Sequence, residues 1–190
     1  MTDADLVARA CEGDDAAFGE LVRRHHAAVY RAALAALGSP ADAEDAAQDA
    51  LLSAYRRLSG FRGASSFRTW LLTITWNAAM NIRRARRRWW MRGTSLDDVS
   101  EMPSAFELPA VDRSPEQMAA CEELRRDISR GICALTPKLR DALLLSQSGE
   151  YTYEEIGGML GAPVGTIKWR VSEARRVLKD RLRARGYTHA

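Results

Sequence analysis

Helical periodicity runs through nearly the whole chain and limits its fold more than any other feature. Apolar residues recur at intervals of three and four, and no stretch of four to eight residues alternates well enough to predict a half-buried strand. The pattern predicts an all-α protein. Its two small helical domains would be joined by a flexible acidic linker, and the C-terminal domain would contain a helix-turn-helix.

Helix boundaries divide the chain into three parts. The stretch from Met91 to Pro115 contains prolines at 103, 109 and 115 and no sustained periodicity, which is typical of a flexible linker. The predicted parts are an N-terminal domain at 1–92, a linker at 93–115 and a C-terminal domain at 116–190. The predicted helices cover about residues 4–11, 16–37, 40–58, 67–90, 116–134 and 137–148, followed by a short helix pair from 153 onward.

Composition excludes several classes of protein. The 190 residues are 46% hydrophobic and 28% charged, as in ordinary globular proteins, and no run approaches the roughly 18 apolar residues of a membrane span. The acidic start lacks the order of a secretory signal, so a cytoplasmic location is expected. Three isolated cysteines and the adjacent His25 and His26 match no metal, nucleophile or phosphate-loop pattern. We therefore expect no metal, no cofactor and no enzymatic activity.

Charge is distributed as a basic, an acidic and a second basic block. Six arginines and no acid lie between Arg83 and Arg92. Between Asp97 and Glu123 there are eight acids and one basic residue, Arg113. Eight basic residues then lie between Lys168 and Arg185. Two separate basic helices indicate two contacts on a polyanion, because Lys and Arg neutralise phosphates. Solvated helix ends are the alternative interpretation.

The segment "TYEEIGGMLGAPVGTIKWR", residues 152–170, predicts the helix-turn-helix. Thr152 and Glu155 form a capping box, and Gly161 to Pro163 end the first helix. In the second helix the core-facing residues are Ile167, Val171, Ala174 and Leu178. The opposite arc suits a DNA major groove, unless it is merely solvated and its tryptophan packs on another domain. That arc carries Gly165, Lys168, Trp169, Ser172, Glu173 and Arg176.

A second candidate surface lies on the long helix of the N-terminal domain. Its expected buried arc is Leu71, Ile74, Ala78, Ile82 and Ala85, and a polar and aromatic stripe beside that arc carries Trp70, Asn77, Asn81 and Arg88. Amides can bond base edges, and aromatic rings can stack on bases. With the neighbouring loop at Phe61 and Arg62, the stripe is a plausible pocket for an unstacked nucleotide. The asparagines could instead cap nearby carbonyls.

A third surface lies on the helix from 40 to 58. Its inner side is rich in alanine, which allows close packing, and its outer side carries Asp42, Asp45, Asp49 and Arg56. Carboxylates repel phosphate, so this face could dock a basic protein partner. A solvated face is the default alternative.

Three blocks together resemble one family. "DAEDAAQDALLSAYRRL", "FRGASSFRTWLLTITWNAAMNIRRARRR" and "LTPKLRDALLLSQSGEYTYEEIGGMLGAPVGTIKWRVSEARRVL" resemble, in order and spacing, the two conserved regions of extracytoplasmic-function sigma factors of bacterial RNA polymerase. The match covers about residues 15–90 and 115–182. The resemblance implies two compact helical domains on a flexible linker, and a function in promoter recognition and opening.

The resemblance also implies partners and site residues. The partners would be core RNA polymerase, through its β′ clamp helices and β subunit, promoter DNA, and an anti-sigma factor held between the domains; the acidic linker would thread toward the active-site and RNA-exit channels. Polymerase would contact Asp42, Asp45, Gln48, Asp49 and Arg56. The −10 element would contact Phe61, Arg62, Ser65, Ser66, Asn77, Asn81, Arg84 and Arg88. The −35 element would contact Thr152, Gly165, Thr166, Lys168, Trp169, Arg170, Ser172, Glu173 and Arg176.

Two positions depart from the family pattern. This chain has Trp169 where the family often has a small residue, commonly serine, and Glu173 where it often has a basic one. The promoter preference is therefore left open. Two other functions also stay open at this point: a repressor or activator that binds duplex DNA without polymerase, and an interaction module whose basic faces are only solvated.

Overall fold

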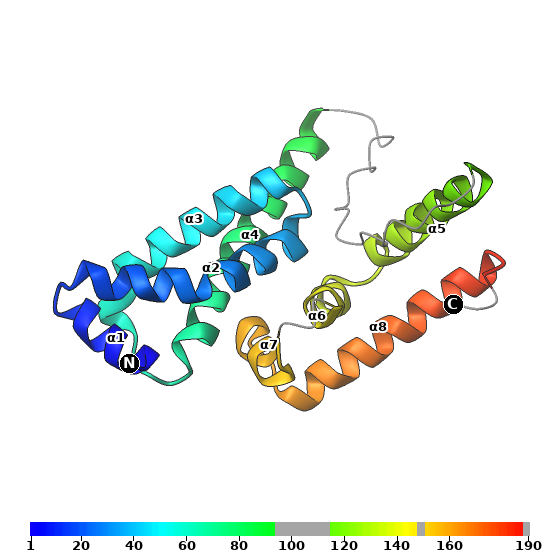
Figure 1. Cartoon of the computed structure of the whole chain (residues 1–190). Coiled ribbons are helices and arrows are strands. Elements are labelled where there is room, and N and C mark those ends of the chain that lie inside the picture. The colour runs from blue at the N-terminus through cyan, green and yellow to red at the C-terminus, as the bar shows by residue number, and fades with distance from the viewer. Residues whose placement is uncertain (94–114, 148–150, 188–190) are drawn as a thin grey trace.

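The structure is a computed structural model that describes residues 1–93, 115–147 and 151–187 (Figure 1). Within these ranges it holds eight α-helices, one 3-10 turn and no strand, so the predicted all-α class is confirmed. The predicted linker lies almost entirely outside the described residues. The helices are α1 (Asp3–Cys11), α2 (Asp15–Leu37), α3 (Pro40–Arg57), α4 (Phe67–Gly93), α5 (Pro115–Cys133), α6 (Pro137–Gln147), α7 (Tyr153–Leu160) and α8 (Val164–Ala184), with the 3-10 turn η1 at Leu58–Gly60.

Side-chain caps define several helix starts. The Asp14 carboxylate accepts from the Ala17 amide at the start of α2, and the Ser39 hydroxyl accepts from the Asp42 amide at the start of α3. The predicted capping box of α7 is present, with Thr152 and Glu155 each accepting from the other's main-chain N–H. Gly161 then ends α7 in the left-handed region at φ 59°, where a glycine costs least.

Helices α1 to α4 surround the first core. Leu6, Leu21 and Leu71 are fully buried in it, and each such side chain contributes about 1.5–3 kcal/mol on burial. The inner alanines of α3 are also fully buried, which brings α3 close to α2 and α4 as expected. Ala85, predicted to be buried, is exposed because it lies beyond Ile82, the last residue of α4 in a core cluster.

Helices α5, α6 and α8 form the second core around Ile132, Leu143, Leu144 and Ala174. The buried carboxylate of Asp127 joins the two ends of this unit. It accepts from Arg130 on α5 and from Arg185 and Tyr187 beyond α8. Burial and this hydrogen bond raise the pKa of Tyr187, in that order of size. These bonds therefore fix the C-terminal end of α8, the longest helix of this unit, on α5.

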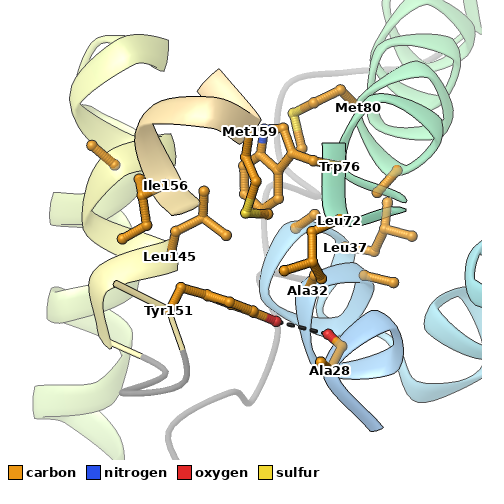
Figure 2. Packing of buried hydrophobic residues seen from close by; sticks show 14 of the residues in the cluster. Ala28, Ala32, Leu37, Leu72, Trp76, Met80, Leu145, Tyr151, Ile156 and Met159 are labelled. Carbon is orange, nitrogen blue, oxygen red and sulfur yellow. Dashed lines mark hydrogen bonds between the residues drawn. The ribbon is translucent and has the colours of Figure 1, made fainter. Parts of the chain in front are cut away.

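The two helical sets also share a core, which the sequence analysis did not foresee (Figure 2). Helix α4 contributes Leu72, Trp76 and Met80 to it, and α7 contributes Ile156 and Met159. Trp76 is only 2% exposed. At one side of this cluster the Tyr151 hydroxyl donates to the Ala28 carbonyl oxygen at 2.7 Å. The two predicted domains thus pack directly against each other in this structure.

Two ion pairs flank the shared core. Arg68 Nε lies 2.8 Å from Glu155 Oε1, and Arg83 Nη2 lies 2.7 Å from Asp141 Oδ1. Surface ion pairs contribute roughly 0–1 kcal/mol, and burial of a pair offsets much of its attraction by desolvation, whereas truncation of a buried tryptophan costs about 3–5 kcal/mol. The apolar cluster therefore dominates the contact, and the ion pairs fix its register. We name this contact the interdomain clasp: the apolar cluster around Trp76, the Tyr151 hydrogen bond and the two ion pairs.

The interdomain clasp includes a close approach at Gly158 of α7, and this position offers a test. A Cβ at Gly158 would lie 2.6 Å from Thr69 Cγ2 of α4. Gly158→Leu should therefore push α7 away from α4 and raise the radius of gyration in small-angle scattering by several ångström, from roughly 16 Å for a compact chain of this length. Far-UV circular dichroism should keep its helical signal.

The matched control is Gly165→Leu. Gly165 is also helical, and a Cβ there meets nothing within 4 Å, so its scattering should equal that of the unmodified chain. An unchanged radius for Gly158→Leu would show that this contact does not hold the two units together.

Candidate nucleic-acid interface

Helix α4 has three faces with different neighbours. Leu71 and Thr75 are buried toward α1 to α3, and Trp76 is buried in the interdomain clasp. The third face is exposed and carries Asn77, Asn81, Arg84 and Arg88. These residues recur at intervals of three and four and form one stripe along the helix. The structure therefore brings together the polar residues of the predicted stripe.

The two asparagines do not act as caps for nearby carbonyls. Asn81 Oδ1 accepts from Arg84 Nη1 at 3.3 Å, and neither asparagine donates to a main-chain carbonyl within the described residues. Asn81 is exposed, so its amide donors are accessible to a ligand. A donor-bearing amide beside a guanidinium can bind a base edge or a phosphate.

Three aromatic rings support the start of this stripe. Phe61 lies 5.2 Å from Trp70 and 6.0 Å from Phe67 between ring centroids, and Phe67 is buried. Phe61 and Trp70 are half-buried, so each keeps part of its ring accessible. An accessible ring held by other rings is a rigid platform on which a base can stack. The predicted Phe61 loop and the Trp70 end of the stripe therefore lie side by side.

The loop between Phe61 and Phe67 is exposed and has its own internal order. Arg62, Ser65 and Ser66 are all exposed, and Gly63 takes a φ of 69° that favours glycine. The Ser66 hydroxyl accepts from the Thr69 amide at 3.0 Å, so it caps α4. Ser66 thus has a structural role, and its contact with DNA stays a prediction.

On α3, acidic and apolar side chains share the outer face. Asp45, Gln48, Asp49 and Arg56 are exposed as predicted. Two large apolar residues are also exposed among them: Leu52 at 54% and Tyr55 at 47%. The sequence analysis missed both, although Leu52 follows Asp49 by three residues and precedes Arg56 by four. We call this set, from Asp45 to Arg56, the α3 docking face.

Two members of the α3 helix are held by neighbours. Asp42 is half-buried, and its Oδ2 lies 2.7 Å from Arg86 Nη2, so this predicted polymerase contact belongs to an internal ion pair. The Tyr55 hydroxyl donates to Asp15 Oδ1 at 2.6 Å, and that bond raises the pKa of Tyr55. Tyr55 therefore presents a fixed ring on the face instead of a mobile one.

Helix α8 presents the second candidate surface. Ile167, Val171 and Ala174 are buried as predicted, and Leu178 is half-buried. Trp169 is 62% exposed and does not pack on another domain. On the same arc Gly165, Lys168, Ser172 and Arg176 are exposed, whereas Thr166, Arg170 and Glu173 are half-buried. The structure therefore presents the predicted face to solvent.

The start of α7 contributes two further contacts. Thr152 is exposed, but its hydroxyl serves the capping box of α7, so its predicted contact with DNA would have to use its remaining lone pair. Lys168 Nζ lies 5.9 Å from the centre of the Tyr153 ring, a cation–π contact. This contact holds the first lysine of α8 over α7.

Arg176 is bound on both sides by acids. Its Nε and Nη2 donate to the two oxygens of Glu173 at 2.9 and 2.7 Å, and its Nη1 donates to Asp180 Oδ2 at 3.0 Å. These bonds lower the pKa of Glu173 and raise that of Arg176. Most of the donor capacity of Arg176 is therefore committed within α8.

Other reactive groups have structural surroundings. His25 is buried and its Nε2 lies 2.7 Å from Asp3 Oδ2, while Cys11, Cys121 and Cys133 form no disulfide. Among the described residues, no three His, Cys, Asp or Glu side chains are placed to hold a metal ion. A search of the same residues found no helix both long and apolar enough to cross a membrane.

Comparison with known proteins gives two family matches in the predicted order. The Sigma-70 region 2 family matches residues 21–91, which span most of α2 to α4, and the Sigma-70 region 4 family matches residues 125–178, which span most of α5 to α8. Two solved structures share the fold over most of their length. CnrH in complex with the cytosolic domain of CnrY has a TM-score of 0.65 and 26% identity, covering 96% of this chain and 97% of that one. The sigma factor RpoE in complex with the anti-sigma factor NepR from Bartonella quintana has a TM-score of 0.60 and 26% identity, covering 87% and 96%.

Curated relatives match over nearly the full length. The ECF RNA polymerase sigma-E factor of Escherichia coli (strain K12) is 36% identical over 187 residues, which cover 96% of this chain and 95% of the relative. The RNA polymerase sigma-H factor of Pseudomonas aeruginosa (strain PAO1) is 34% identical over 184 residues, covering 95% and 93%. The chain belongs to the ECF sigma factors of RNA polymerase.

Proposed function

We propose that this chain binds core RNA polymerase, directs it to specific promoters and opens the −10 element to start transcription. The observation that carries the proposal is the pair of exposed surfaces on α4 and α8, one in each sigma-70 region. Such a factor works where polymerase and the chromosome are, in the cytoplasm. It is an initiation factor, and the chemistry of transcription belongs to the polymerase.

The division of labour follows the two regions. Residues 1–92 would bind the polymerase clamp and the −10 element, residues 116–190 would bind the −35 element, and residues 93–115 would connect them. This division places the α3 docking face and the α4 stripe on one unit. Polymerase and single-stranded DNA would then contact different sides of that unit.

The α4 surface fits single-stranded DNA. Phe61 and Trp70 offer stacking surfaces, and base stacking on an aromatic ring contributes about 1–3 kcal/mol per base. Asn77 and Asn81 add amides, and Arg84, Arg88 and Arg62 add charge for the phosphates. A base that leaves the duplex loses its stack, and the aromatic platform replaces part of that loss. Ser65 and Ser66 lie on the same loop.

The α8 surface fits duplex DNA. A major groove admits one helix, and Gly165, Thr166, Lys168, Trp169 and Ser172 lie in its first turns, where such helices contact base edges. The remaining predicted contacts, Thr152, Arg170, Glu173 and Arg176, surround this group.

The α3 docking face fits a protein that is basic and partly apolar. Asp45 and Asp49 supply complementary charge, and Leu52 and Tyr55 supply the apolar centre that stable interfaces need. We assign this face to the β′ clamp helices of polymerase, with Gln48 and Arg56 at its edge. Asp42, already paired with Arg86, supports the helix more than the contact.

The closed arrangement must open for this function. Elements centred at −10 and −35 lie about 25 base pairs apart, or roughly 85 Å along B-form DNA. A compact chain of this length has a radius of gyration of roughly 16 Å, so α4 and α8 cannot reach both elements while the interdomain clasp is closed. Two solved relatives are complexes, one with an anti-sigma factor and one with the cytosolic domain of CnrY. An anti-sigma partner of this chain would act by holding the clasp closed.

DNase footprinting with and without core polymerase tests the proposed function. Protection of the −10 and −35 elements should appear only when polymerase is present, because the closed chain cannot span them. Protection of a duplex by the chain alone would instead identify a self-sufficient repressor or activator. Absence of salt-sensitive binding in every assembly would identify an interaction module.

Asn77→Ala, and to a smaller extent Asn81→Ala, should impair promoter opening and leave polymerase binding intact. The α4 stripe and the α3 docking face have no residue in common, so only base contacts should be lost. Permanganate reactivity of melted thymines should fall, and titration with core polymerase should be unchanged. Gln147→Ala, an exposed amide on α6, is the control. Normal opening by both asparagine variants would rule out the stripe.

Asp45→Arg combined with Asp49→Arg should weaken assembly with core polymerase by tenfold or more. Reversed charges on a complementary surface replace attraction by repulsion, which costs several kcal/mol for close groups. Affinity is measured by titration with labelled core polymerase, with Glu12→Arg at the exposed end of α1 as the control. An unchanged affinity would remove the α3 docking face from the interface.

A further inference from the structure

We infer that Glu173 accepts a hydrogen bond from the amino group of a cytosine in the −35 duplex, and that Arg176 is the positioning residue that holds its carboxylate. The inference rests on the proposed function of α8 as the helix that reads this duplex. It assigns one base and one contact, and it gives Arg176 a role other than phosphate binding.

Glu173 lies in the middle of the outward side of α8. Trp169, Glu173, Arg176 and Asp180 follow one another at intervals of four, three and four, so they form one stripe. Buried Ile167, Val171 and Ala174 lie on the opposite side of the helix. Side chains of a helix lean toward its N-terminus, so the Glu173 carboxylate points toward the turn of Trp169. That turn is the part of α8 that would lie deepest in the groove.

The Arg176 guanidinium holds this carboxylate in one orientation. Two parallel bonds of 2.9 and 2.7 Å join the groups, and the third nitrogen is anchored on Asp180. A planar two-bond contact of this kind fixes the carboxylate plane as well as its position. Each Glu173 oxygen accepts one bond from Arg176 and retains a lone pair for another donor.

Charge around the stripe allows a carboxylate in the groove. Arg176 cancels one of the two acids, so the stripe keeps a net charge of only −1, which limits repulsion of the phosphates. Lys168, Arg175 and Lys179 are exposed on the flank of the same helix and supply the attraction to the backbone. Affinity would therefore come from the flank, and the stripe would be left to discriminate between bases.

An ionised carboxylate can only accept hydrogen bonds, so it favours bases that present a donor in the major groove. In the major groove cytosine presents an amino donor, guanine presents only acceptors, and thymine presents an acceptor and a methyl group. Adenine has an amino donor beside the N7 acceptor, which would repel one carboxylate oxygen. Cytosine is therefore the best partner. Trp169 lies about 6 Å earlier along the helix, or roughly two base-pair steps, and would contact a base pair about two steps away.

An ordinary surface ion pair is the competing explanation. Pairs three residues apart on exposed helices contribute about 0.2–0.5 kcal/mol to stability and have no effect on sequence preference. The two explanations therefore differ in base selection, which stability measurements do not report.

Selection from a promoter pool with a randomised −35 region and a fixed −10 element tests the inference. Holoenzymes would carry the unmodified chain, Glu173→Ala, Arg176→Lys or, as the control, Glu122→Gln, an exposed acid that pairs with Arg126 on α5. The unmodified chain should enrich cytosine at one position by about tenfold or more over the other bases. Glu173→Ala should lose that enrichment at that position only. Arg176→Lys should weaken it, because lysine cannot make the two-bond contact, and Glu122→Gln should retain it.

Identical preferred sequences for the unmodified chain and Glu173→Ala would overturn the inference. It would also be overturned if Glu173→Ala lost the enrichment of a base other than cytosine. If the unmodified holoenzyme selects no −35 sequence at all, the proposed role of α8 fails and the inference falls with it. Circular dichroism and a thermal midpoint close to that of the unmodified chain would show that each variant still folds.

Discussion

Burial of Trp76 against α7 is the contact on which the arrangement of the whole chain depends. It joins two helical units that would otherwise be connected only through residues 94–114, which lie outside the described part of the chain. The contact is largely apolar, with Tyr151 and two ion pairs at its edge. The contact is not covalent, so a partner that binds either unit more tightly than the units bind each other can open it.

Helical arcs made most of the fold predictable from sequence. Capping residues such as Thr152 and Ser39, and the glycine that ends α7, fixed boundaries that the structure reproduces closely. The interdomain clasp was not predicted. Leu72, Trp76 and Met80 form a second apolar arc on α4, and helical spacing alone does not show whether such an arc packs within its own domain or against the other one. The exposure of Leu52 and Tyr55 was not predicted for a related reason. A single apolar residue within a polar face of a helix can be recognised as exposed only when its solvent accessibility is known.

The type and the position of the candidate site residues could be predicted from the sequence. The side chains that each of them binds within the chain were harder to predict. The outward position of Asn77, Asn81 and Trp169 follows directly from helical spacing. The pairing of Arg176 with Glu173 and Asp180 also follows from spacings of three and four, yet a count of positive charge alone hides it. Arginines in this chain thus differ in their surroundings: Arg68, Arg83 and Arg185 bind acids of the chain, and Arg62, Arg84 and Arg88 are exposed on the surface that we propose for the −10 element.

We expect the chain to be closed when alone and open on a promoter, and a distance between its two units tests this most directly. Fluorescent labels would be attached through Glu12→Cys at the end of α1 and Lys138→Cys on α6, both exposed positions, in a chain whose three natural cysteines are replaced by serine. Single-molecule energy transfer should give one short distance for the chain alone. In the complex with core polymerase and promoter DNA the distance should be longer by tens of ångström, because the two elements lie roughly 85 Å apart. The same distance in both states, or a long distance in the chain alone, would contradict the account.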